Sequence, residues 1–232
     1  MPVRALLVVL LLLAGLTLLA DRVAVGIAED RVADQLAGKG GLVGTPEVDI
    51  TGFPFLTQVV AGRYEDVRVA LDADELGQPA GTRADVSLRG VHVPLRTVLS
   101  GSVQEVPVED IDGTATLAYD LLAAELGSDA TVTREGDGLR IGRTVEVLGL
   151  TLPVSAAGTV TLDGDQLVVD VEDAAGAGVD IPDFLVDRVS DLLDLRYTVP
   201  ELPLGLQLTS VTPGAEGVEV QVEATDAVLT AR

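Results

Sequence analysis

Hydrophobic residues follow one another without a break near the start of the chain. The segment from Ala5 to Ala20 carries no charge, is rich in Leu and Val, and follows one cation, Arg4. As a helix it reaches about 24 Å, against roughly 30 Å for bilayer hydrocarbon. The pattern predicts, within residues 1–28, an export signal or, as the favoured alternative, a short uncleaved membrane anchor. The remaining chain is expected in the cell envelope, on the outer face of the cytoplasmic membrane or in a periplasm-like space.

Beyond this segment the spacing of hydrophobic residues changes twice. From Asp21 to about Ala37 they recur at near-helical intervals, so the helix is expected to continue until the glycine-rich run at residues 38–41. After Gly44 the period becomes two, which is typical of half-buried strands. Strands are expected at Asp66–Asp72, Ala84–Leu88 and Val91–Leu95.

The alternation slips by one residue at Gly90, where we expect a β-bulge. The bulge would keep a set of hydrophobic residues on one strand face, namely Val86, Leu88, Val91, Val93 and Leu95. The cationic or titratable side chains of Arg89, His92 and Arg96 would share the opposite face.

Turn signals divide the second half of the chain into short elements. Hairpins are expected at Gly136–Gly138, Asp163–Gly164 and Pro213–Gly217. Two short helices are expected at Tyr119–Leu126 and Pro182–Leu193. Together the patterns predict an α+β fold, in which a membrane segment and helix precede a long, curved, mostly antiparallel sheet. Residues 29–232 are expected to form a single domain.

Composition narrows the possible partners. The chain has 37 Asp and Glu against 15 Lys and Arg, a formal charge of −22, which repels nucleic acid. Its hydrophobic fraction is 47% with only 3% aromatic residues, so the interior must be aliphatic. Such an interior suits an ordinary core, and it is also a suitable solvent for acyl chains.

Residues of common catalytic centres are scarce. One His and no Cys exclude a Cys–His pair and a two-His zinc site, and the sequence has neither a nucleophile elbow nor a phosphate-binding glycine loop. The acidic run Glu109–Gly113 is interpreted as a turn rather than a calcium site. We therefore expect no enzyme activity, no cofactor and no resident metal.

Two short stretches are the candidates for binding. Gly52–Gln58 concentrates two of the three Phe residues with a Pro, and it could dip into a bilayer, cap an apolar groove or plug the core. Arg89, His92 and Arg96 could bind a phosphate, although pairing with nearby carboxylates is the commoner use of such charges.

These stretches also carry a resemblance. The Ala20–Ala24 run after the apolar segment, Ile50–Gln58 and Leu88–Leu95 resemble segments of the LmeA-type family of actinobacterial cell-envelope phospholipid-binding proteins. Gly113–Thr116 and Tyr197–Leu208 fit the order of later elements. The resemblance implies a fold like the tubular lipid-binding domains, in which a bent antiparallel sheet wraps a long helix and leaves an apolar groove. It also implies phospholipid binding and a part in maintaining envelope lipids or lipoglycans.

The resulting hypothesis is an anchored or secreted protein that holds phospholipid by its acyl chains, with phospholipid and membrane as partners. The expected acyl-chain contacts are Phe53, Phe55, Leu56, Val91, Val93, Leu95, Phe184, Leu185 and Leu192. The expected headgroup contacts are Arg89, His92 and Arg96, which can serve a lipid only at a rim or strand twist because they oppose Val91 and Val93. The alternatives are a non-catalytic envelope interaction module and an enzyme acting on envelope lipid or glycan.

Overall fold

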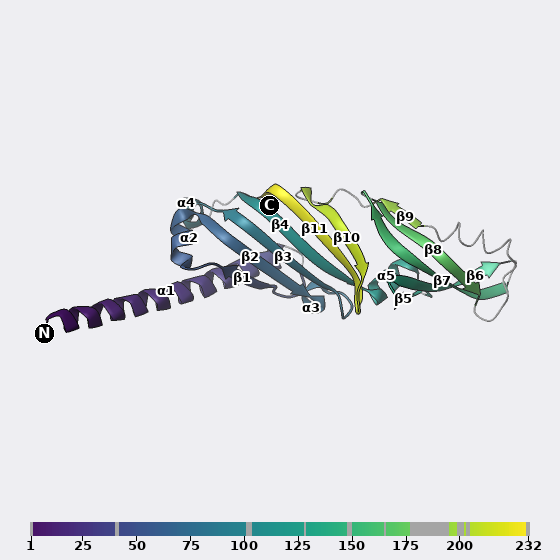
Figure 1. Ribbon diagram of the computed structural model, residues 1–232, viewed down its shortest axis with the longest axis horizontal. Helices are drawn as coiled ribbons and strands as arrows, with labels where there is room; N and C mark the ends of the chain where they lie inside the picture. The colour runs from purple at the N-terminus through teal and green to yellow at the C-terminus, as the bar shows by residue number, and fades with distance from the viewer. Residues whose placement is uncertain are drawn as a thin grey trace. The chain divides into compact units, whose positions relative to one another are not determined.

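The computed structural model describes residues 2–39, 42–100, 104–127, 129–147, 150–164, 166–176, 195–198, 202 and 205–230. Over these residues the chain is α+β, as predicted (Figure 1). Its helices are α1 (Pro2–Lys39), α2 (Phe55–Ala61), α3 (Ala73–Leu76), α4 (Leu95–Ser100) and α5 (Tyr119–Leu126). Its strands are β1 (Glu47–Thr51), β2 (Arg63–Asp72), β3 (Arg83–His92), β4 (Glu105–Ala118), β5 (Thr131–Glu135), β6 (Gly138–Val147), β7 (Leu150–Asp163), β8 (Gln166–Gly176), β9 (Leu195–Thr198), β10 (Gln207–Pro213) and β11 (Gly217–Thr230).

The strands form two sheets. A six-stranded sheet has the order β1-β2-β3-β4-β11-β10, and a five-stranded sheet has the order β5-β6-β7-β8-β9. The pair β1–β2, the pair β10–β11 and the four successive pairs from β5 to β9 are antiparallel. Long alternating strands joined by short turns therefore build most of the described chain, as the period of two indicates.

The residues gather into two compact units, each built from separated stretches of the chain. Unit 1 contains Met1–Ala70, Val86–Ile111 and Thr225–Arg232, and unit 2 contains Leu71–Asp85 and Asp112–Ala224. The long strands β2, β3, β4 and β11 contribute residues to both units. A single domain over residues 29–232 stays a prediction.

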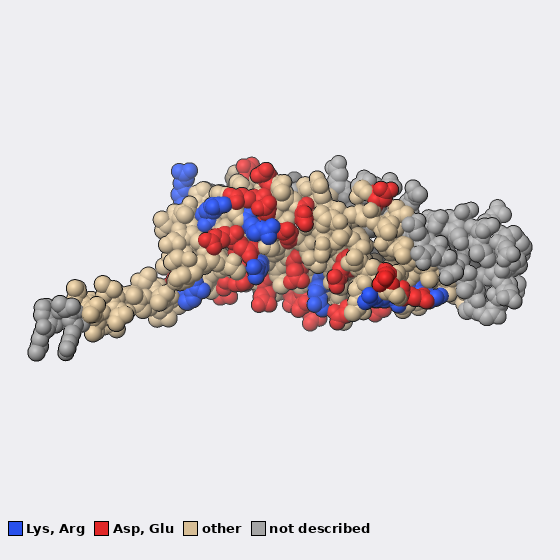
Figure 2. All heavy atoms as spheres, viewed as in Figure 1, with Lys and Arg blue, Asp and Glu red and all other residues tan. Residues whose placement is uncertain are grey.

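Helix α1 has two contrasting halves. Leu6–Leu19 leaves its hydrophobic side chains exposed, and no other element lies beside it in Figure 1. This stretch is also free of charge (Figure 2). Beyond it, Asp21, Val25 and Ala33 are buried at helical spacing, so the second half of α1 packs on its unit. The helix is long and apolar enough to cross a membrane and continues past Ala20, as predicted.

The strand expected over Val91–Leu95 is an incorrect prediction. β3 ends at His92, and Leu95 and Arg96 begin α4 instead. Pro94 lacks an N–H for the strand ladder, and its carbonyl accepts the N–H of Thr97 at 2.9 Å, which starts the helical turn. Arg96 therefore does not share a strand face with Arg89 and His92.

The break in alternation at Gly90, within β3, has a local structural basis. Gly90 adopts a φ of +62°, and Gly90 and Val91 are buried in succession where alternation would expose one of them. A side chain at Gly90 would also overlap the Glu109 carboxylate. The backbone therefore turns at Gly90 as the pattern indicates, whereas the register of a bulge stays a prediction.

All three hairpins are confirmed by strand pairing, with Val132 opposite Ile141, Asp163 opposite Gln166 and Pro213 opposite Val218. The helix expected at Tyr119–Leu126 is α5, whereas the one expected at Pro182–Leu193 lies outside the described residues. In unit 2, α5 packs on a core formed by Val132, Leu139, Val211 and Val218. Its first residue, Tyr119, donates its hydroxyl to the Gly214 carbonyl at 2.8 Å.

Replacing Gly217 by alanine is expected to destabilise unit 2. A Cβ at Gly217 would lie 2.6 Å from the carbonyl carbon of Leu117, a backbone atom that cannot move aside without shifting the strand. Overpacking of this kind costs roughly 1–3 kcal/mol. Thermal unfolding of the full chain in detergent, followed by circular dichroism, measures the loss.

Gly38→Ala is the matched control for this substitution. Nothing lies within 4 Å of a Cβ built at Gly38, which is in α1. An alanine there should leave the transition unchanged or raise it, because alanine favours a helix over glycine by roughly 0.5–1 kcal/mol. Equal melting behaviour of Gly217→Ala and the parent chain would contradict the close approach.

Candidate functional site

In unit 1, the loop before α2 is fastened to α1 just beyond the apolar segment. Asp21 is 1% exposed, and its Oδ1 accepts the backbone N–H of Leu56 at 2.8 Å. Its Oδ2 pairs with the Arg22 guanidinium at 2.8 Å. That guanidinium also lies 5.3 Å from the centre of the Phe53 ring. These contacts fix the Phe-containing loop at the first charged turn of α1.

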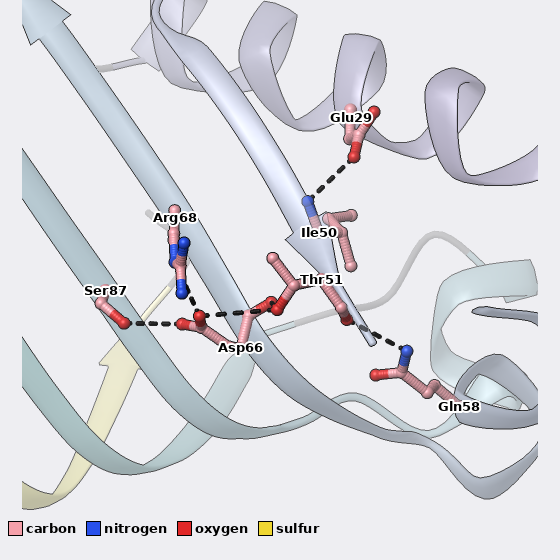
Figure 3. A network of polar contacts seen from close by, with 7 residues as sticks. All are labelled: Glu29, Ile50, Thr51, Gln58, Asp66, Arg68 and Ser87. Carbon is pink, nitrogen blue, oxygen red and sulfur yellow. Dashed lines mark hydrogen bonds and ion pairs between the residues drawn. The ribbon is translucent and has the colours of Figure 1, made fainter. Parts of the chain in front are cut away.

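A second contact joins α1 to the edge of the six-stranded sheet. Because β1 is an edge strand, some of its backbone groups face away from β2. Glu29 accepts the N–H of Ile50 at 2.9 Å, as Figure 3 shows. The helix therefore covers part of an edge that could otherwise pair with another chain.

Gln58 connects the loop to the two strands that flank it. Its side chain is buried, with the residue 7% exposed, and its amide nitrogen donates to the Thr51 carbonyl at 3.1 Å (Figure 3). Its amide oxygen accepts the N–H of Glu65 at 2.8 Å. One amide thus satisfies a group at the end of β1 and another near the start of β2.

Asp66 extends this polar network across β2 and β3. Its carboxylate accepts the Ser87 hydroxyl at 2.6 Å and Nε of Arg68 at 2.8 Å (Figure 3). Thr51 donates its hydroxyl to the Asp66 carbonyl at 3.3 Å. The network holds three neighbouring strands in register beneath α1.

Gly62 brings the two sequence motifs together. This residue ends α2 with a φ of +69°, and its carbonyl accepts the N–H of Val93 at 2.9 Å. A Cβ at Gly62 would lie 3.0 Å from Cα of Pro94, so a larger residue would push the segments apart. Gly52–Gln58 and Leu88–Leu95 are therefore neighbours in space although they are distant in sequence.

The acyl-chain candidates occupy different environments in unit 1. Phe55 and Val91 are buried, at 4% and 6% exposure, and the Phe55 ring lies 6.1 Å from that of Tyr64. Burial raises the pKa of the Tyr64 hydroxyl. Phe53 is 61% exposed and Leu56 is 36% exposed. Val93 and Leu95 are half-buried. The remaining candidates, Phe184, Leu185 and Leu192, lie outside the described residues.

One headgroup candidate, His92, has a carboxylate neighbour, as the commoner use of such charges predicts. This carboxylate, Glu109, lies within β4, so the turn expected over Glu109–Gly113 is an incorrect prediction. Both carboxylate oxygens of Glu109 accept hydrogen bonds from Nη2 of Arg63, at 2.9 and 2.7 Å. One of these oxygens also lies 3.8 Å from Nε2 of His92. Arg89 is exposed on β3, and Arg96 is exposed on α4. A phosphate at this position would have to compete with Glu109 for its cations.

Sequence reasoning missed the polar residues that join these elements: Asp21, Glu29 and Gln58. A signal was present, because positions 21, 25, 29 and 33 repeat every four residues and Val25 and Ala33 mark this as a packed face. Ile27 and Leu36, by contrast, are among the hydrophobic residues that recur at near-helical intervals in this stretch, and they are exposed.

A hollow of about 420 Å³ lies between the second half of α1 and the start of β1. Glu29, Asp30, Asp34 and Glu47 give it an acidic lining. Carboxylates at this density would lose hydration against an acyl chain, so the hollow does not match the expected groove. Among the residues that the structure describes, no group of three or more His, Asp or Glu side chains could hold a metal ion.

The apolar N-terminal helix on an α+β body indicates a signal anchor or an association with a membrane. A family model described as LmeA-like phospholipid-binding matches residues 19–223, and the chain belongs to this family. It is therefore a lipid-binding protein, with phospholipid as the ligand class of its family. Neither the curated proteins nor the solved structures contain a match to the chain.

Replacing Gln58 by leucine is expected to lower the free energy of unfolding by roughly 1–3 kcal/mol, because the Thr51 carbonyl and the Glu65 N–H lose the partner with which they form part-buried hydrogen bonds. Thermal unfolding of the full chain in detergent measures the change. Val60→Leu is the control on the same helix, since Val60 is 77% exposed, and it should unfold like the parent. A Gln58→Leu chain as stable as this control would show that the amide does not fasten the loop.

Proposed function

We propose that the chain is an envelope protein that remains anchored by α1 and holds a phospholipid by its acyl chains in an apolar groove of the β-rich body. We further propose that this binding serves the maintenance of envelope lipids or lipoglycans. The family membership supplies the ligand class, and the proposal adds the mode of binding and the location.

The observation that carries the proposal is the unbroken course of α1. The helix runs from Pro2 to Lys39, with an exposed apolar first half and a second half packed on unit 1. Asp21 and Glu29 hold that second half to the loop and to the sheet edge. An anchor of this design keeps a lipid-binding body beside the bilayer from which phospholipid would be taken.

The neighbouring motifs give the proposed acyl-chain contact its position. Val91 and Phe55 provide buried aliphatic and aromatic surface, and the half-buried Val93 and Leu95 extend it just beyond the end of β3. Removing apolar surface from water contributes roughly 25 cal/mol per Å², so two acyl chains need no charged contact for affinity. Arg89, His92 and Arg96 are proposed as headgroup contacts at the rim.

Photolabelling of the full chain in vesicles tests acyl-chain binding. The probe is phosphatidylcholine with a diazirine near the end of one acyl chain, and labelled tryptic peptides are identified by mass spectrometry. Trypsin releases residues 90–96, which contain Val91, Val93 and Leu95, separately from residues 5–22 of the apolar segment. We expect label in both peptides, with label in 90–96 lowered by excess unlabelled phospholipid.

A matched pair of variants controls this experiment. Val93→Asn places an amide at the half-buried position and should reduce label in residues 90–96, whereas Asp49→Asn, on the exposed side of β1, should not. Circular dichroism checks that both variants are folded. Label confined to residues 5–22 would reject the acyl-chain groove at this position and favour an anchored interaction module.

A further inference from the structure

An exposed apolar surface lies where α1 leaves the body of unit 1. It consists of Phe53 at 61% exposure, Leu56 at 36% and Val60 at 77%, and we call these three residues the docking face. Leu56 and Val60 are four residues apart on α2 and therefore lie on one side of that helix. In Figure 1, α2 and α4 lie at the end of unit 1 from which the free half of α1 projects.

The contacts of Asp21 and Arg22 determine at which turn of α1 the docking face lies. Leu56 is bonded to Asp21, and the Phe53 ring lies 5.3 Å from the guanidinium of Arg22. Arg22 follows the last residue of the apolar segment by two positions, which is about 3 Å along a helix. Phe53 is thus held at the level where the apolar segment ends.

The length of the apolar segment brings the bilayer to the same level. Its span of about 24 Å falls roughly 6 Å short of the hydrocarbon thickness. If the shortfall is shared between the two ends, the hydrocarbon boundary reaches about 3 Å past Ala20, to the level of Arg22. An aromatic ring beside an arginine is well suited to that depth, because each combines apolar surface with a polar contact.

Asp21 can lie close to the hydrocarbon boundary because its carboxylate is buried within the protein. A carboxylate near hydrocarbon is costly when it is unpaired. Here its two oxygens bond the Leu56 N–H and the Arg22 guanidinium, and the residue is 1% exposed within the protein. The first acidic residue of the chain is therefore shielded from lipid by the loop that carries the docking face.

We propose that the docking face rests in the outer leaflet of the membrane that holds α1, with Phe53 inserted at the level of Arg22. This inference rests on the anchored form of α1 in the proposed function. It adds a second attachment, which fixes the tilt of unit 1 against the bilayer. Acyl-chain binding near Val93 is a separate event that does not depend on it.

Single tryptophans test the docking, because the chain contains none of its own. Phe53→Trp reports on the docking face, Leu12→Trp on the apolar segment, and Val43→Trp on a matched apolar position. Val43 is 77% exposed and follows the far end of α1, about 28 Å beyond Ala20 by helix length. Each full-length variant is reconstituted in vesicles of phosphatidylcholine and phosphatidylglycerol that contain lipids brominated high on the acyl chains.

We expect bromine to quench Leu12→Trp and Phe53→Trp and to leave Val43→Trp unquenched and water-exposed in its emission. If Leu12→Trp is quenched while Phe53→Trp behaves like Val43→Trp, docking is wrong and the anchor stands. A blue-shifted but unquenched Phe53→Trp would also overturn it, since a protein partner or second copy would then cover the face. An unquenched Leu12→Trp would remove the anchor and the docking together, whereas label in residues 90–96 would still test lipid binding by itself.

Discussion

Unit 1 depends on a carboxylate buried where an apolar helix first becomes polar. Desolvating an ionised Asp is expensive unless hydrogen bonds replace its water. Asp21 receives a backbone N–H from Leu56 and a guanidinium from Arg22, so the charge is stable only while α1, the loop and α2 are together. Loss of the contact would leave Oδ1 of Asp21 and the Leu56 N–H without this hydrogen bond. The second half of α1 is consequently part of the folded unit, and the apolar first half continues directly from it.

The same helix protects the body along its length. The Glu29 carboxylate accepts a hydrogen bond from the Ile50 N–H on the edge strand β1. Asp66 and Gln58 form the hydrogen bonds that connect the neighbouring strands. A chain without cysteine has no disulfide to close such an edge. Directional polar contacts on α1 and an aliphatic core together replace that constraint. Protection of the sheet edge and the proposed anchoring are thus two uses of one helix.

Regular patterns were enough to predict the regular parts of the fold. The three hairpins, α5 and the continuation of α1 follow from glycine-containing turns and from spacings of two and of three to four residues. The end of β3 was misjudged because alternation continues through Val93 and Leu95, while Pro94 withdraws the N–H that a strand needs. Periodicity records which side chains are apolar, whereas Pro94 acts on the backbone.

The candidate site was harder to predict, since its key contacts join residues far apart in sequence. Asp21 and Leu56 are 35 positions apart, and Glu29 and Ile50 are 21 apart. From the sequence, Asp21 and Glu29 are indistinguishable from solvated helix charges, and only the shared spacing with Val25 and Ala33 separates them. The proximity of the two motifs likewise depends on Gly62, whose carbonyl accepts a hydrogen bond from the Val93 N–H. No periodicity in the sequence indicates that these two residues are in contact.

A formal charge of −22 is unfavourable for the proposed location of the body beside a membrane surface. Screening limits that repulsion to about 8 Å at physiological ionic strength, however. On the face shown in Figure 2 the acidic side chains gather over the strands, and the stretch Leu6–Leu19 of α1 is uncharged. The second half of α1 extends about 28 Å beyond Ala20, so acidic groups near its far end lie several screening lengths from the end of the apolar segment. In the proposed anchored form, the residues nearest the lipid are therefore the few at that end, and the acidic groups near the far end of α1 lie beyond the range of this repulsion.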